Sequence, residues 1–223
     1  MYLMLATRLD LAYPVGMLAH HAANPSLDHE RALCHLVGYL MHTLDYALVY
    51  HKPEANYRTP GILEAYTDAD WAGEKHSGRS TSGMAIWKND SLVAWGSKRQ
   101  GIVSRSTMES EYIAMFKATN HVLWLLAIEE QLGINEWRPL VYCDNQAAIA
   151  VAKGGEMSFK TTRFMNIKYH SVRDEHAAKR IVIDYVKSED NLADIFTKRT
   201  TDTVLSNHRD CFMELLFTLE DDK

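Results

Sequence analysis

Side chains alternate in character along Leu63-Glu64-Ala65-Tyr66-Thr67-Asp68, and this stretch ends in an acid. Alternation with a period of two is typical of a strand that buries one face, so we expect the first strand of a sheet here. Two short apolar runs follow at 84–87 and 92–95, with Asn89-Asp90 between them. Asn and Asp tolerate the backbone of tight turns, so these two runs predict a hairpin.

A long amphipathic pattern follows the hairpin. Apolar residues recur at three- and four-residue steps from about Ser106 to Leu132, and Gly133 is placed as a C-cap, which predicts one long helix. The later pattern predicts a strand at 140–143, a short helix from Asn145, a basic helical segment, a strand at 181–186 and a last helix from Ser188. Strands and helices alternate in this way in α/β proteins. We therefore expect a mixed five-stranded sheet flanked by helices.

The chain ahead of the sheet has a helical pattern. Asn24-Pro25 breaks the first fifty residues, and Ser26 is placed as the N-cap of an amphipathic helix. Residues 51–60 hold two prolines and no periodicity, as a linker does. The sequence thus predicts four parts: a small helical segment at 1–52, a linker at 53–61, an α/β domain at 62–200, and a C-terminal helix with an acidic tail at 201–223.

Composition excludes several classes of protein. The chain has 223 residues, a formal net charge of -5 and 47% hydrophobic residues. These values are those of a globular chain, not of a disordered or repetitive one. The sequence has no apolar run of the roughly 20 residues that cross a bilayer. Its three cysteines are too few and too scattered for a disulfide framework or a zinc cluster.

Two acids stand where predicted strands end. Asp68 closes the first strand, and Asp144 directly follows the apolar strand at 140–143. Open α/β sheets place their ligand sites at the carboxyl ends of strands, which favours a functional role for both acids. For Asp144 a structural alternative stays open, because an acid can also cap the short helix near Asn145.

Two further acids lie on predicted helices. Glu111 lies about 60° from the centre of the apolar stripe, where an ionised carboxylate costs several kcal/mol unless it is paired or bound to a metal. Glu109 lies about 100° off on the other side, so we expect it to be solvated and choose Glu111. Asp194 lies between apolar neighbours in the last helix, and its alternative role is that of a first-turn acid favoured by the helix dipole.

Four carboxylates from two strand ends and two helices could converge on one site for a hard metal ion. Oxygen-only ligation suits Mg²⁺, with Mn²⁺ as an alternative, and the absence of histidine and cysteine from the set argues against zinc. Such a cluster supports phosphodiester hydrolysis by two metal ions about 3.5–4 Å apart. The predicted ligands of two Mg²⁺ ions are Asp68, Glu111, Asp144 and Asp194.

Six short motifs occur in a fixed order along the chain. They are Tyr66-Thr67-Asp68-Ala69-Asp70-Trp71-Ala72-Gly73, Arg79-Ser80-Thr81-Ser82-Gly83, Trp95-Gly96-Ser97-Lys98-Arg99-Gln100, Ser106-Thr107-Met108-Glu109-Ser110-Glu111-Tyr112, Cys143-Asp144-Asn145-Gln146-Ala147-Ala148 and Leu192-Ala193-Asp194-Ile195-Phe196-Thr197-Lys198. With these motifs the chain resembles, over about residues 62–200, the RNase H domain of copia-type retrotransposon Pol polyproteins. One motif alone is weak evidence, but six in register are specific.

The resemblance implies an RNase H-like α/β fold and cleavage of the RNA strand of RNA–DNA hybrids during reverse transcription. The family's four metal-binding acids fall on the set chosen above, so we expect Asp68, Glu111, Asp144 and Asp194 to be catalytic. Residues 1–50 resemble the end of the preceding reverse transcriptase, its thumb or connection region. The expected partners are the hybrid and the palm and fingers of that polymerase. The expected location is inside the cell, in a cytoplasmic virus-like particle or the nucleus, and not in a membrane.

Basic side chains near the acids are expected to hold the substrate, because proteins recognise RNA–DNA hybrids through the backbone and groove shape. Lys98, Arg99 and Arg105 flank the strand-to-helix corner near Glu111, and we expect the segment at 160–180 to form a second basic surface. The family usually has a histidine within this segment, where the chain has Phe164. We expect this change to weaken a substrate contact or a role in product release.

Two other functions fit parts of the pattern. A non-catalytic scaffold would keep the fold and dock onto a reverse transcriptase; the four intact acids disfavour it, and Phe164 favours it. A DNA transposase or integrase core uses the same kind of sheet. That class ends its series of acids in Glu, whereas the order here is Asp, Glu, Asp, Asp.

Overall fold

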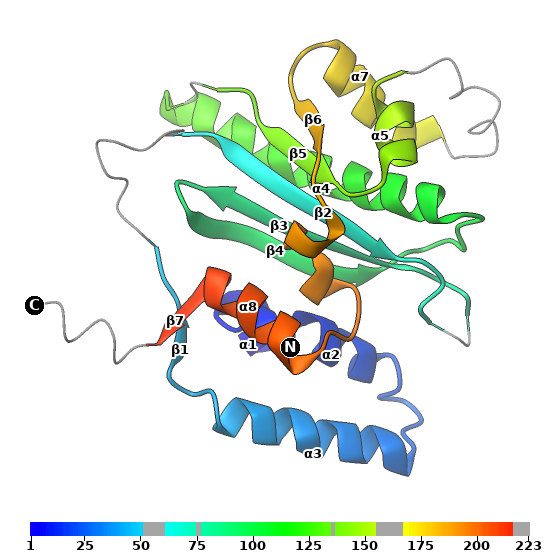
Figure 1. The fold of residues 1–223 in the computed structure, drawn as a ribbon, viewed down its shortest axis with the longest axis vertical. Coiled ribbons are helices and arrows are strands. Elements are labelled where there is room, and N and C mark those ends of the chain that lie inside the picture. The colour runs from blue at the N-terminus through cyan, green and yellow to red at the C-terminus, as the bar shows by residue number, and fades with distance from the viewer. Residues whose placement is uncertain (51–60, 75–76, 135–136, 155–166, 216–223) are drawn as a thin grey trace, which may run out of the picture.

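The computed structural model describes residues 1–50, 61–74, 77–134, 137–154 and 167–215. At its centre lies a five-stranded sheet with the order β4-β3-β2-β5-β6 (Figure 1). The strands are β2 (Leu63–Asp70), β3 (Thr81–Lys88), β4 (Ser91–Arg99), β5 (Leu140–Cys143) and β6 (Val182–Tyr185). Strands β2, β3 and β4 pair antiparallel, whereas β5 and β6 continue the sheet parallel to β2. The predicted α/β class with a mixed five-stranded sheet is confirmed.

Local sequence signals set the hairpin and the long helix. Asn89 and Asp90 both adopt positive φ, 50° and 53°, in the two-residue turn between β3 and β4. Helix α4 (Thr107–Leu132) begins at Ser106, whose side chain accepts a hydrogen bond from the Glu109 amide. It ends at Gly133 with a φ of 69°, a conformation that glycine adopts without strain. The predicted C-cap is therefore present, and Ser106, where the pattern predicts the helix to start, is its N-cap.

Helices cover both faces of the sheet, because successive strand residues point to opposite sides. One face packs on α4, α5 (Gln146–Ala152) and α7 (Ser171–Ala177), which follows the 3₁₀ turn η2 (Ile167–His170), with Ile86 in that core. The next residue toward the N-terminus, Ala85, belongs to the opposite core. That second core also contains Leu9, Ala12, Leu92, Ile195, Phe196, Phe212 and Met213.

The N-terminal segment packs directly on this second face. It contains α1 (Tyr2–Ala6), η1 (Leu9–Leu11), α2 (Ala12–Ala19), α3 (Leu27–Met41) and the strand β1 (Tyr46–Leu48). Trp95 on β4 donates its indole N–H to the Met4 carbonyl at 2.8 Å. Helix α3 has the predicted N-cap Ser26, whose amide donates to Nδ1 of His29 at 2.9 Å. The helices of the described segments are all too short or too polar to cross a bilayer.

The prediction of helix throughout the first fifty residues is wrong at β1. This strand pairs antiparallel with β7 (Met213–Leu215), from the other end of the chain. The extended conformation is favourable here only because a distant segment pairs with it, so no local sequence pattern predicts this strand. The domain boundaries near 52, 61 and 200 stay predictions, but the 1–50 segment shares its core with the sheet.

The prediction of one continuous last helix from Ser188 is also wrong. Two 3₁₀ turns, η3 (Ser188–Asp190) and η4 (Asp194–Phe196), precede the helix α8 (Asp202–Phe212). Asn191 lies between the turns with an extended ψ of 101°. Its buried side chain donates to the Thr67 carbonyl on β2 at 2.9 Å, which ties the chain to the sheet and interrupts the helix. Asp194 therefore starts a short turn held against β2.

Candidate carboxylate site

The sheet brings the first two acids together. Asp144 directly follows β5, as predicted. Asp68 lies within β2, and the prediction that it ends this strand is wrong, because pairing with β3 continues to Asp70. Strands β2 and β5 are parallel neighbours, with Thr67 opposite Cys143 in the register. Because the next residue on each strand is an acid, Asp68 and Asp144 lie side by side where β5 ends. The N-cap alternative for Asp144 is excluded, since Asn145 caps α5 by accepting a hydrogen bond from the Ala148 amide at 2.9 Å.

Helix α4 places Glu111 beside this pair. Ligand atoms of Glu111, Cys143 and Asp144 all lie within 4.8 Å of one another. Burial raises the pKa of Glu111 to about 10, with added repulsion from Asp68 and Asp144. Its Oε2 is buried and finds no hydrogen-bond donor among the described residues. This carboxyl group is therefore under-satisfied in the way expected of a ligand for a cation.

Asp194, the first residue of η4, is the fourth acid of the site. Burial, and next the neighbouring Asp194, raise the pKa of Asp68 to about 6. Burial also raises the pKa of Asp194, although Lys198 opposes the shift with its Nζ 2.8 Å from Asp194 Oδ2. The other oxygen, Asp194 Oδ1, is buried and lacks a donor within the described part of the chain. The four predicted acids thus converge on one site.

Neutral and basic side chains hold three of these acids in place. The Thr197 hydroxyl donates to Oδ2 of Asp68, and Lys198 pairs with Asp194. Ser188, which the pattern assigns to a helix cap, donates instead to Oδ2 of Asp144 at 2.6 Å. Thr197 and Lys198 lie in one of the six motifs, but no periodicity predicts these contacts.

A glycine allows η4 to approach the sheet. Gly83 pairs with Asp68 in the β2–β3 register. A Cβ atom on Gly83 would lie 2.6 Å from Cγ2 of Thr197 and 2.8 Å from the Ala193 carbonyl oxygen. These distances are too short for any real side chain, and one of the contacts is backbone. Only glycine at this position lets the Asp194 turn lie against β2.

We therefore expect Gly83→Ala to destabilise the protein by about 1–3 kcal/mol, the usual cost of overpacking. Urea unfolding followed by circular dichroism measures the change. Gly96→Ala on β4 is the matched control, because its added Cβ meets only the flexible Met84 side chain, at 3.2 Å. Equal stability of the two variants would contradict the close approach of η4.

Glu109, Cys143 and Asp70 each lie within two residues of one of the four acids. Glu109 was expected to be solvated, and this is wrong: it is buried and accepts a hydrogen bond from the Arg105 amide at 2.7 Å. Burial raises the pKa of the Cys143 thiol, so it stays protonated and unsuited to a hard cation. Burial and Asp68 raise the pKa of Asp70, whose carboxyl group packs over Gly73.

The predicted nucleic-acid contacts differ in their surroundings. Lys98 and Arg105 are exposed, whereas Arg99 pairs with Glu74 at 2.9 Å. Trp71 is 48% exposed and donates to the Ser104 carbonyl at 3.3 Å. Phe164 and the first part of the basic segment, up to residue 166, lie outside the described residues, whereas 167–180 are described and include η2 and α7. The substrate-binding roles of these residues stay predictions.

The donor set fits a hard divalent cation. It offers carboxylate oxygens from four elements, two of them buried and without donors in the described structure. Oxygen ligands of this kind are preferred by Mg²⁺ and Mn²⁺. An α/β sheet that gathers four acids in this way defines a carboxylate site able to hold metal ions against a phosphate group.

No model of a protein family matches the chain. The chain is similar to the retrovirus-related Pol polyprotein of transposon TNT 1-94 from Nicotiana tabacum, with 31% identity over 198 residues. It is similar to that of transposon RE1 from Arabidopsis thaliana, with 30% identity over 202 residues. These alignments cover 89% and 90% of this chain. The chain is homologous to a segment of the Pol polyproteins of copia-like retrotransposons.

The matched relatives are much longer proteins. The alignments cover 14% and 13% of the two polyproteins, so the chain spans about a seventh of their length. A shorter relative is the secreted RxLR effector protein 161 of Plasmopara viticola, 42% identical over 125 residues. That alignment covers 56% of this chain and 84% of the effector.

Two solved structures align with about two thirds of the chain. The N-terminal RNase H domain of Rv2228c from Mycobacterium tuberculosis aligns with a TM-score of 0.41 and 14% identity, over 67% of this chain and 97% of that one. LC11-RNase H1 in complex with an RNA/DNA hybrid aligns with a TM-score of 0.45 and 17% identity, over 64% and 99%. The fold of this chain rests on the strand order and register described above.

Proposed function

We propose that this chain is a metal-dependent endoribonuclease that cleaves the RNA strand of RNA–DNA hybrids. The main support is the meeting of Asp68, Glu111, Asp144 and Asp194 from four separate elements. Gathering four acids, of which Asp68, Glu111 and Asp194 are buried, is unfavourable without cations, so a purely structural role does not explain them. Homology to a segment of Pol polyproteins supports a substrate formed during reverse transcription.

The four carboxylates are proposed as ligands and the side chains around them as supports. Two bound Mg²⁺ ions would supply Lewis-acid activation of the scissile phosphate and of the attacking water. Thr197 and Ser188 orient Asp68 and Asp144 through their hydroxyl groups. Lys198 holds Asp194 and balances part of the negative charge before metal binds.

We expect the purified chain to cleave the RNA strand of a hybrid in Mg²⁺ and to leave it intact in EDTA. Double-stranded RNA and duplex DNA of the same sequence should be cut at least about a hundredfold more slowly. Gel analysis of end-labelled strands measures all three substrates together. Nicking of duplex DNA at the rate of the hybrid would instead favour a transposase-like activity.

A non-catalytic binding protein is the second candidate function. The similarity to a secreted effector favours it, because the name of that relative describes no nuclease. Such a protein would bind the hybrid in EDTA and show no cleavage in Mg²⁺ or Mn²⁺. The same assay therefore separates the two functions.

The proposed surroundings follow from the family. The chain spans only a small part of each polyprotein relative, so we infer a reverse transcriptase palm and fingers as its partner. The proposed location is intracellular, in a cytoplasmic virus-like particle or the nucleus. Co-purification with the polymerase part of the same element would test the partner.

A further inference from the structure

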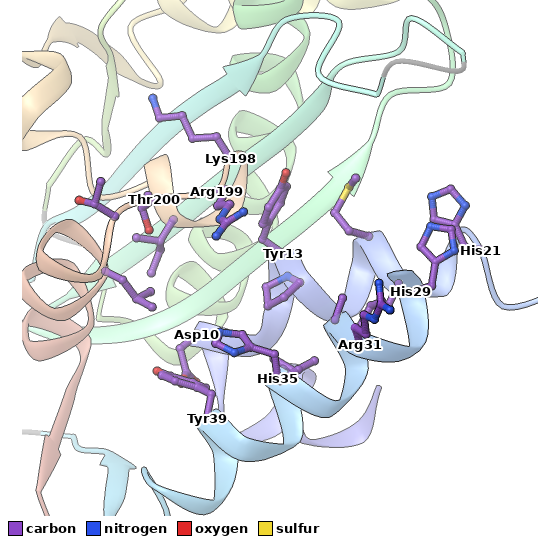
Figure 2. Close-up of a pocket in the computed structure, with 18 residues that line it drawn as sticks. Asp10, Tyr13, His21, His29, Arg31, His35, Tyr39, Lys198, Arg199 and Thr200 are labelled. Atoms are coloured by element: carbon purple, nitrogen blue, oxygen red, sulfur yellow. The ribbon is translucent and has the colours of Figure 1, made fainter. Parts of the chain in front are cut away.

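A large pocket lies between the N-terminal helices and the chain that follows η4. Its volume is about 1150 Å³, and its walls come from α2, α3 and the stretch 195–205 (Figure 2). Binding pockets for small molecules usually measure about 300–1,000 Å³, so this one has room for more than a single small ligand. None of the four acids lines the pocket, so the proposed cleavage chemistry does not account for it.

The pocket adjoins the carboxylate site. Lys198 lines the pocket, and its Nζ lies 2.8 Å from Oδ2 of Asp194. Ile195, the residue after Asp194, also lines it. A nucleic-acid strand with a phosphate at the carboxylates would therefore reach the pocket within a short distance.

The fixed charges of the pocket lining are mostly positive. They are those of Arg31, Lys198 and Arg199, and three histidines, His21, His29 and His35, lie in the same lining (Figure 2). Asp10 is the acid of the lining, and Arg8 holds it with Nη2 2.7 Å from Oδ2. Arg31 pairs with Asp28 at 3.1 Å on the exposed surface, where such a pair is weak. The lining therefore favours an anionic occupant.

The pocket also offers flat apolar surface. Pro14, Met17, Leu36 and the ring of Tyr13 lie between the cations, as does Tyr39, whose hydroxyl donates to Asp10 at 2.7 Å. Unpaired nucleotides combine phosphates with exposed base faces, which stack on aromatic and apolar side chains. A duplex hides its base faces and would use only the cations.

We propose that this pocket binds an unpaired nucleic-acid strand that extends from the hybrid held at the carboxylate site. Arg31 and Arg199 contact its phosphates, and the apolar floor accepts its bases. The proposal rests on the proposed hybrid substrate but concerns a different surface. It makes the N-terminal segment part of the substrate-binding surface.

Fluorescence anisotropy in EDTA tests the pocket without cleavage. The probes are a blunt labelled hybrid and the same hybrid with a single-stranded RNA or DNA overhang on either strand. We expect at least one overhang to tighten binding by about tenfold, as stacking of one base can do. Comparing RNA with DNA overhangs shows which strand occupies the pocket. An equal affinity for blunt and overhang hybrids would overturn the proposal.

A double variant tests the location. Arg31→Ala with Arg199→Ala should remove the preference for the overhang. The matched control, Arg138→Ala with Lys153→Ala, removes two exposed cations that lie outside the pocket lining and should keep the preference. Loss of the preference in both variants would assign it to net charge and contradict the pocket. Competition by polyglutamate as effective as that by single strands would identify an acidic protein ligand and also overturn the proposal.

These experiments distinguish a failure of the pocket proposal from a failure of the nuclease proposal. Cleavage of the blunt hybrid in Mg²⁺ reports on the carboxylate site alone. Cleavage without an overhang preference would end the pocket proposal and leave the nuclease proposal standing. An overhang preference that depends on Arg31 and Arg199, without cleavage in Mg²⁺, would do the reverse.

Discussion

Asp68→Asn and Asp144→Asn are each expected to lower Mg²⁺-dependent cleavage of the hybrid by at least about a hundredfold. Asparagine keeps the size of the side chain but removes the charge that holds a cation. The stabilisation that metal ions give a phosphoryl transition state amounts to several kcal/mol, and each 1.36 kcal/mol is tenfold in rate. Single-turnover cleavage of end-labelled RNA in the hybrid measures the loss, and circular dichroism checks that each variant is folded.

Glu109→Gln provides the matched control for these variants. Glu109 is a buried acid two residues from Glu111, and its carboxylate accepts a hydrogen bond that glutamine can also accept. Its activity should stay within a few-fold of that of the unchanged protein. Robust cleavage by both asparagine variants would remove Asp68 and Asp144 from the proposed catalytic set. A loss as large in Glu109→Gln would show that any change near the helix start disables the site.

Much of the fold could be predicted because its signals are local. Ser106 and Gly133 mark the ends of α4, and Asn89-Asp90 marks the hairpin, so each element carries its own boundary. Predictions failed where a distant partner decides the structure. Strand β1 exists because residues 213–215 pair with it, and η4 replaces a helix because Asn191 bonds to β2.

The four acids of the site could be predicted from the sequence, but the contacts that hold them together could not. Each acid stands out by itself, since a carboxylate at a strand end or on an apolar helix face is unusual. The contacts that draw Asp194 to Asp68 depend on Gly83 and Thr197, whose roles appear only in three dimensions. The pocket depends on residues 10–39 and 195–205, which meet on the same face of the sheet, so no sequence window contains it.

Glu111→Gln is expected to stabilise the metal-free protein while strongly reducing its stabilisation by Mg²⁺. The pKa of Glu111 is raised from 4.5 to about 10 by burial and by Asp68 and Asp144, and that of Asp68 is raised from 3.8 to about 6. Between these unfolded and folded values the folded state binds more protons than the unfolded state. The contribution of these two groups to the free energy of unfolding of the metal-free protein therefore falls as the pH rises from about 4 to about 10.

Glutamine removes the largest part of this pH dependence because it cannot lose a proton. At pH 8 in EDTA, the Tm of Glu111→Gln should exceed that of the unchanged protein by about 3 °C or more, since 1 kcal/mol moves Tm by about 2–4 °C at this chain length. Mg²⁺ should raise the Tm of the unchanged protein, because a ligand that binds only the folded state stabilises it, and should raise that of the variant much less. Glu130→Gln, the same change at an exposed position of α4, should alter neither value. A lower Tm for metal-free Glu111→Gln would mean that Glu111 stabilises the metal-free fold, and it would contradict its proposed role as a metal ligand that is unfavourable without the cation.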